Sequence, residues 1–155
     1  FLDPWQDATD VGYQLIHSLY AIGSGGFFGV GLGQSKQKAL YIPEPYNDFI
    51  FSIIIEETGF LGGMLIISLF LVLIAAGINV AIKAKDMYGR LLATGIISVV
   101  AIQLIINVAV VTGSMPVTGI PMPFISYGGT SMVFIMAAMG IVLNIAKVSK
   151  AVENK

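Results

Sequence analysis

The sequence has no cysteine, one histidine and few charged residues. Without cysteine, the chain can form neither disulfides nor thiolate metal sites, and its redox compartment cannot be inferred. A single histidine makes a histidine-based metal cluster implausible. Charged residues make up 11% of the chain, against roughly 25% in soluble domains. The net charge of −1 gives no electrostatic basis for nucleic-acid binding.

Hydrophobic residues make up 56% of the chain and gather in long runs. A transmembrane helix needs about 20 mostly apolar residues, and three runs qualify: 60–82, 91–111 and 124–146. The first run can extend back to Phe49, which would give a tilted helix or one that emerges from the bilayer. The third begins with polar residues, so its span can start near Ser131. These runs predict an all-α polytopic membrane protein with three transmembrane helices.

Lysine and arginine in the short loops predict the orientation of the spans. The loop 83–90 and the tail 147–155 lie on one side and carry six such residues, whereas the other side carries only Lys36 and Lys38. The loop and the C-terminal tail are therefore predicted to be cytoplasmic. The expected order is an extracytoplasmic loop 1–48, a helix 49–82, the cytoplasmic loop 83–90, a helix 91–111, an extracytoplasmic loop 112–127, a helix 128–146 and the cytoplasmic tail 147–155.

The extracytoplasmic segment contains a short amphipathic pattern and a glycine-rich stretch. Residues 11–23 place apolar side chains at helical spacing, which predicts a short helix lying in the membrane interface. The stretch 23–33 superficially resembles a dinucleotide-binding fingerprint, but no strand precedes it, and we reject that interpretation. It is either a flexible turn or a backbone wall beside a ligand, since glycine permits close backbone approach.

Three carboxylates, Asp48, Glu56 and Glu57, lie close together around an apolar run, although carboxylates are costly at membrane depth. The predicted orientation places them near the outer surface. Asp48, or Asn47 beside it, is predicted to cap the following helix, which does not exclude a catalytic role. Glu56 lies roughly 80° around the helix from Asp48 and could serve the same cavity. Alternatively, the glutamates bind polar groups of other helices.

Several other polar residues and one unwound segment are also candidates for a site. Lys36 and Lys38 either reach the lipid headgroups or bind a phosphate. Gln103 and Asn107, four residues apart, are expected to hydrogen-bond neighbouring helices. Prolines and glycines in 115–131 predict an unwound segment, which at membrane depth needs surrounding protein or a water-filled cavity. That segment forms either a site wall or a plain loop-to-helix junction.

Four stretches together resemble a known family: FLDPW, GYQLIHSLYAIGSGGFFGVGLGQSKQK, PEPYNDFIFSIIIEETGFLGG and PVTGIPMPFISYGGTS. In this order and spacing they are similar to the SEDS proteins, the FtsW/RodA/SpoVE family, and particularly to its FtsW and SpoVE members in Gram-positive bacteria. The resemblance covers nearly the whole chain. It implies a fold of about ten transmembrane helices, of which this chain would be a C-terminal portion with the last three.

The family resemblance also implies a function in the bacterial cytoplasmic membrane. It implies a peptidoglycan glycosyltransferase that polymerises lipid II into glycan strands during division or sporulation. The expected partners are a class B penicillin-binding protein, other divisome or elongasome membrane proteins, and membrane lipids. It further implies that the aspartate of the DFIF motif, Asp48, is essential.

The chemistry of glycan polymerisation gives the candidate residues their roles. A sugar hydroxyl needs a base within hydrogen-bond reach, and a pyrophosphate leaving group needs a cation nearby. Asp48 is the expected general base, or a ligand of a divalent cation (Mg²⁺ or Mn²⁺). The expected substrate-binding residues are Lys36, Lys38, Glu44, Ser126 and Tyr127, with Lys36 and Lys38 at the pyrophosphate. The expected structural or cavity-lining residues are Glu56, Glu57, Gly128 and Gly129.

Two other functions remain open. A lipid II flippase would use these residues as a translocation path, although the runs 60–82 and 91–111 offer no polar midplane site of the kind that transporters use. The chain could also be a scaffold without activity. Three helices can hardly enclose a large lipid-linked substrate, so we expect the isolated chain to be inactive.

Overall fold

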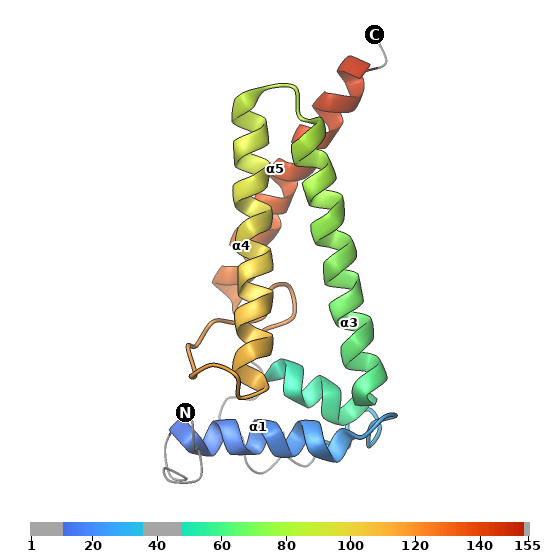
Figure 1. The fold of residues 1–155 in the computed structure, drawn as a ribbon, viewed down its shortest axis with the longest axis vertical. Helices are drawn as coiled ribbons and strands as arrows, with labels where there is room; N and C mark the ends of the chain where they lie inside the picture. Colours follow the sequence, from blue (N-terminus) through green and yellow to red (C-terminus); the bar gives the residue numbers. More distant parts are fainter. Residues whose placement is uncertain (1–10, 36–47, 154–155) are drawn as a thin grey trace.

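The structure is a computed structural model that describes residues 11–35 and 48–153. Within these residues it contains four helices, shown in Figure 1: α1 (Val11–Gly25), α3 (Ile50–Lys83), α4 (Met87–Val111) and α5 (Gly129–Glu153). The three longer helices are each long and apolar enough to cross a membrane. The predicted fold class, three membrane-spanning helices and one short helix, is therefore confirmed.

The long helices α3 and α4 form an antiparallel pair, and α5 crosses them obliquely (Figure 1). The turn between α3 and α4 ends at Asp86, whose side chain accepts a hydrogen bond from the backbone N–H of Gly89 and caps α4. α1 lies across the opposite end of the pair, nearly perpendicular to it. A helix across the ends of spanning helices lies along the membrane plane, as the apolar spacing of 11–23 predicts.

α1 is held against the ends of both long helices. Leu15 and Ala21 are buried, and the hydroxyl of Ser18 donates to the backbone carbonyl of Val111 at 3.0 Å. Val111 is the last residue of α4, where helical carbonyls lack partners within the helix. Ser18 therefore both anchors α1 and satisfies a buried acceptor.

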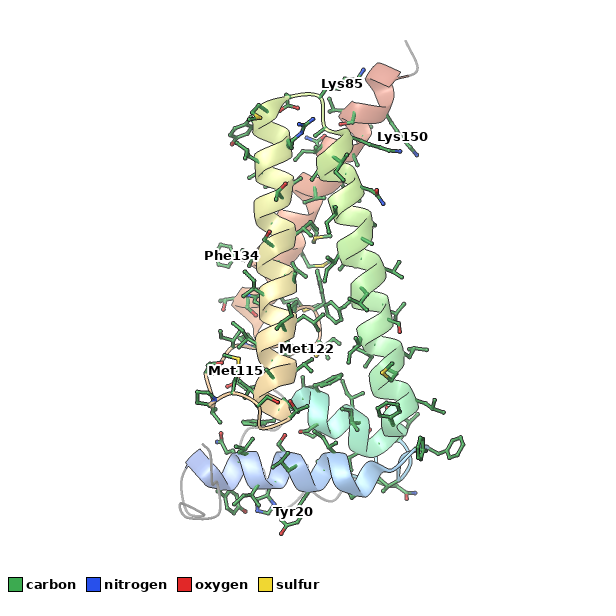
Figure 2. The ribbon with its side chains drawn as sticks, in the orientation of Figure 1. Tyr20, Lys85, Met115, Met122, Phe134 and Lys150 are labelled. Atoms are coloured by element: carbon green, nitrogen blue, oxygen red, sulfur yellow. The ribbon has the colours of Figure 1, made fainter. Side chains whose placement is uncertain are left out.

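The hydrophobic core joins α3, α4 and the loop 112–128. Its buried members are Phe49, Phe51, Phe70, Val100, Leu104, Val110, Val111 and Met122. Other faces of the long helices carry large apolar side chains that are exposed in the chain by itself, including Leu65, Leu69 and Val72. Phe134 of α5 is also exposed, and Figure 2 shows it pointing away from the bundle. Such faces suit contact with lipid or with further helices.

Gly59 interrupts α3 with a φ of 75° and a ψ of −176°, and the first turns run at a steep angle to the rest (Figure 1). In an unbroken helix, the N–H groups of Phe60 and Leu61 would bond carbonyls four residues earlier. Here they donate to the carbonyls of Gly26 and Phe27, at 2.8 and 3.4 Å. The glycine-rich segment therefore accepts the donors that the kink releases.

The same segment also supplies donors to the carbonyls that the kink leaves free. The backbone N–H of Val30 donates to the carbonyl of Glu56 at 2.9 Å, and that of Gly31 donates to the carbonyl of Glu57 at 3.1 Å. A Cβ placed on Gly29 would lie 2.2 Å from the carbonyl oxygen of Glu57. Glycine is required there because the two backbones touch, so this stretch is a hydrogen-bonded brace on α3 rather than a flexible turn.

The prediction that Asp48 caps α3 is wrong. The cap position is Phe49, with φ −105° and ψ 14°, and no side chain caps it. Phe49 is buried in the core, and the hydroxyl of Ser52 donates to its carbonyl at 2.7 Å. Packing of Phe49 starts the helix one residue later than the polar pattern indicates, and Asp48 stays in the turn ahead of it. Asn47 lies outside the described residues.

We expect the substitution Gly59→Ala to destabilise the protein. A Cβ there would lie 2.4 Å from the carbonyl oxygen of Phe27 and from the nitrogen of Gly29, at a positive φ. Such backbone strain costs about 1–3 kcal/mol, and thermal unfolding in detergent micelles would measure it as a lower Tm. Gly95→Ala in α4 is the control, because a Cβ there meets nothing within 4 Å and alanine favours the helix. Equal Tm values for the two variants would contradict the prediction.

Candidate functional site

Asp48 lies half-buried in the turn before α3, and α3 begins at the end of the molecule where α1 lies (Figure 1). Its carboxylate faces Gly119 in the loop 112–128. A Cβ on Gly119 would meet Asp48 Oδ2 at 3.7 Å. Gly119 has a φ of 68°, a conformation that favours glycine. The loop therefore presents bare backbone next to the carboxylate, and part of the Asp48 side chain stays accessible.

Asn107 of α4 connects Asp48 to that loop. Its side chain is only 1% exposed. Its Nδ2 donates to the backbone carbonyls of Asp48, at 2.9 Å, and of Ile120, at 3.0 Å. We expected Asn107 to bond a neighbouring helix, but its partners are instead a turn and a loop. An amide within the last turns of an apolar span was the signal in the sequence that this position has a polar partner.

Ser126 stabilises the loop 112–128 from within. It is 5% exposed, its Oγ accepts from the backbone N–H of Met122 at 2.7 Å, and its own N–H donates to the Met122 carbonyl at 3.1 Å. Gly128 N–H donates to the Ser126 carbonyl at 2.9 Å. These bonds form a compact turn ahead of α5. Tyr127 beside it is exposed, so its phenol lies at the surface.

The two glutamates flank the kink of α3. Glu56 is 2% exposed, and its carboxylate accepts a hydrogen bond from the hydroxyl of Ser35, which is also buried. Glu57 is half-buried, and its backbone carbonyl receives the Gly31 N–H. Both glutamate carbonyls thus hold the glycine-rich segment, and the Glu56 side chain holds Ser35 just after it. Of the other predicted cavity-lining residues, Gly128 is half-buried, while Gly129 is exposed at the start of α5.

Lys36, Lys38 and Glu44 lie in the segment 36–47, outside the described residues. Both flanks of this segment are described. Ser35 is bonded to Glu56 before it, and Asp48 is bonded to Asn107 after it. The predicted phosphate-binding lysines are therefore only one and three residues along the chain from Ser35.

A divalent cation at Asp48 finds few protein ligands in the described part of the chain. No group of three His, Cys, Asp or Glu residues gathers at one point within residues 11–35 and 48–153. Mg²⁺ usually binds one or two carboxylates and takes its remaining ligands from water and substrate phosphates. The described residues thus do not form a metal cage.

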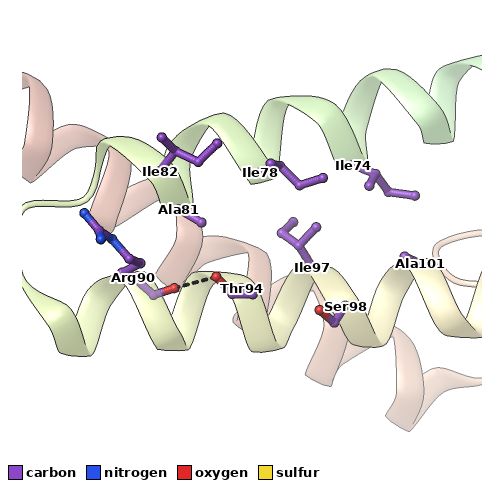
Figure 3. Close-up of a pocket in the computed structure, with 9 residues that line it drawn as sticks. All are labelled: Ile74, Ile78, Ala81, Ile82, Arg90, Thr94, Ile97, Ser98 and Ala101. Carbon is purple, nitrogen blue, oxygen red and sulfur yellow. Dashed lines mark hydrogen bonds between the residues drawn. The ribbon is translucent and has the colours of Figure 1, made fainter.

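The opposite end of the helices has a different character. Lys85 and Lys150 lie there, far from Met115 and Met122 (Figure 2). A groove between α3 and α4 toward that end is lined mainly by isoleucine and alanine side chains, with Arg90 at its edge (Figure 3). The Arg90 guanidinium donates to the carbonyl of Ala84 at 3.3 Å. Asp48 does not line this groove, and among the described residues no acidic side chain does. The groove suits an apolar occupant.

Curated relatives share this sequence along nearly its whole length. It is 55% identical over 150 residues to "Stage V sporulation protein E" of Bacillus subtilis (strain 168), covering 97% of this chain and 41% of that protein. It is 51% identical over 146 residues to "Probable peptidoglycan glycosyltransferase FtsW" of Geobacter sp. (strain M18), covering 94% and 40%. The protein of that same name in Bacillus subtilis is 48% identical over 153 residues, covering 99% and 38%. The chain thus spans about two-fifths of these relatives.

A solved structure has the same arrangement of helices. It is described as "Structural coordination of polymerization and crosslinking by a peptidoglycan synthase complex", and one of its chains matches with a TM-score of 0.77 at 28% identity. The match covers 96% of this chain and 40% of that one. The family model named FtsW/RodA/SpoVE, with the description "Cell cycle protein", matches residues 1–151. Because that match includes nearly every residue, the chain belongs to the FtsW/RodA/SpoVE family of cell cycle proteins.

Proposed function

We propose that the whole protein is a peptidoglycan glycosyltransferase that polymerises lipid II, with Asp48 as its general base. One observation carries the proposal: a half-buried carboxylate, fixed at the end of an apolar helix bundle, in a chain about half identical to proteins named for this activity. The structural neighbour belongs to a peptidoglycan synthase complex, which supports the same reaction class.

The environment of Asp48 suits proton abstraction from a sugar hydroxyl. A general base must lie within hydrogen-bond distance of the proton it removes, and a half-buried carboxylate beside the bare backbone of Gly119 leaves space for that approach. Asp48 accepts the proton while the hydroxyl oxygen attacks the anomeric carbon, and the pyrophosphate departs with its bonding electron pair. The anchored backbone keeps the carboxylate in place, which reduces the entropic cost of the encounter.

Both reactants are tethered to lipid, so the reaction belongs at the membrane surface. Asp48 lies in the turn before α3, and α3 begins at the end of the bundle where α1 crosses the helices. The lysine and arginine distribution predicts that this end faces outward. Lys36 and Lys38 would stabilise the negative charge on the departing pyrophosphate. The same placement in the bacterial cytoplasmic membrane, with a cytoplasmic C-terminus, brings the product to the cell-wall side.

The proposed partner is a class B penicillin-binding protein that crosslinks the new strands. The structural neighbour combines polymerization and crosslinking in one complex, and exposed apolar faces on α3 and α5 leave surface for further helices. Similarity to a sporulation protein and to FtsW supports a role in sporulation or division. Further membrane proteins of the division or elongation machinery would then be neighbours of the complex.

We expect Asp48→Asn in the whole protein to abolish glycan polymerisation, because an amide cannot accept the proton. A gel assay of glycan strands formed from purified lipid II would measure this, with the partner protein present. Asp86→Asn is the matched control: Asp86 caps α4 at the opposite end, and asparagine caps equally well. Polymer formed by a well-folded Asp48→Asn variant would refute the role of this residue.

The paired substitutions Lys36→Gln and Lys38→Gln test the role proposed for the two lysines. If these lysines contact the pyrophosphate, their neutral replacements raise the KM for lipid II by about tenfold, the equivalent of roughly 1.4 kcal/mol. Steady-state polymerisation rates over a range of lipid II concentrations measure the change. Lys85→Gln, in the turn at the other end of the bundle (Figure 2), should leave KM unchanged. An unaltered KM in the Lys36/Lys38 variant removes them from the site.

A further inference from the structure

The two hydrogen bonds of Asn107 leave no freedom in the orientation of its amide. Both partners, the carbonyls of Asp48 and Ile120, are acceptors, so the nitrogen must point at them and the oxygen must point away. That oxygen is buried and has no hydrogen-bond partner among the described residues. A buried, unpaired polar atom costs roughly 1–3 kcal/mol. An apolar side chain would avoid that cost, so the specific contribution of asparagine here lies in its two N–H bonds.

We propose that Asn107 is a positioning residue that fixes Asp48 against the loop 112–128; this inference rests on the proposed catalytic role of Asp48. Two bonds of 2.9 and 3.0 Å to one nitrogen keep the carbonyl oxygens of Asp48 and Ile120 within about 6 Å of each other. The nitrogen belongs to α4, which is helical on both sides of it. The helix therefore sets the distance between the catalytic turn and the loop that faces it.

Asn107 acts through Asp48 and not on the substrate. It is 1% exposed, so a sugar or phosphate cannot reach it, and its bonds go to backbone atoms rather than to the carboxylate. Its loss would let the turn and the loop separate. Misplacement of a catalytic group by about 1 Å can lower the rate by about 100-fold. Loss of Asn107 should therefore lower kcat, while the KM for lipid II changes little.

Gln103 provides a matched control one turn earlier on the same helix. It also carries a buried amide oxygen without a hydrogen-bond partner among the described residues, but it does not bond Asp48 or Ile120. It lies instead near Ser131 and Phe134 of α5. Gln103→Leu removes a comparable amide from α4 and leaves the tie between Asp48 and the loop intact.

The kinetic test compares Asn107→Leu, Asn107→Asp and Gln103→Leu in the whole protein with its partner. Asn107→Asp keeps the volume of the side chain and removes the NH₂ group. It replaces Asn107→Leu in the comparison if the leucine variant does not fold. We expect kcat for lipid II polymerisation to fall about 100-fold in both Asn107 variants, with KM within about twofold. Gln103→Leu should retain most of the activity. A kcat equal to that of the unmodified protein in a folded Asn107 variant overturns the inference.

A crosslinking test separates this inference from the proposed function. The chain has no cysteine, so the pair Asp48→Cys and Ile120→Cys can be introduced with any cysteine outside this chain replaced by serine, and treated with a short thiol crosslinker. We expect the pair to crosslink several times more slowly when Asn107→Leu or Asn107→Asp is added, and at an unchanged rate with Gln103→Leu. Equal rates in all variants would show that Asn107 does not hold the two segments together. If Asp48→Asn stays active while crosslinking depends on Asn107, the catalytic proposal fails and the positioning contact stands.

Discussion

The end of this bundle where α1 lies depends on hydrogen bonds to the backbone groups that become free where α3 bends. Polar backbone groups without partners are costly in apolar surroundings, and the kink at Gly59 releases two donors and two acceptors. The glycine-rich segment pairs with all four, which is possible only because Gly29 and Gly59 lack side chains at the contact. The bend redirects the first turns of α3, and these turns begin next to Asp48.

Polar side chains near this end act mainly on the backbone. Ser18 bonds the end of α4, Ser126 closes its own loop, and Asn107 bonds a turn and a loop. Each gives backbone groups a hydrogen-bond partner, as an apolar interior requires. Together they fix the surroundings of Asp48 and leave its carboxylate half-buried. Such a frame would serve the general-base role proposed for Asp48.

Local patterns were enough to predict the spans and the family. The apolar runs predicted three membrane helices because hydropathy depends on the residues of each segment alone, and the quoted motifs identified the family that the comparison with its model shows. The cap of α3 was predicted wrongly, although it too is a local feature. Burial of Phe49 in the core decided where that helix begins, and a polar residue next to an apolar run does not reveal that burial.

The sequence by itself determined that this is a helical membrane protein of a known family, with one carboxylate, Asp48, ahead of a long span. Only the tertiary structure decided which groups surround that carboxylate. Asn107 reaches Asp48 across 59 positions, and Ser35 reaches Glu56 across 21. Spacing along the chain cannot predict such contacts, because they depend on the kink at Gly59 and on the packing of α4 against α3. Periodicity identifies the face of a helix, but the partner of a buried polar group depends on which segment folds against it.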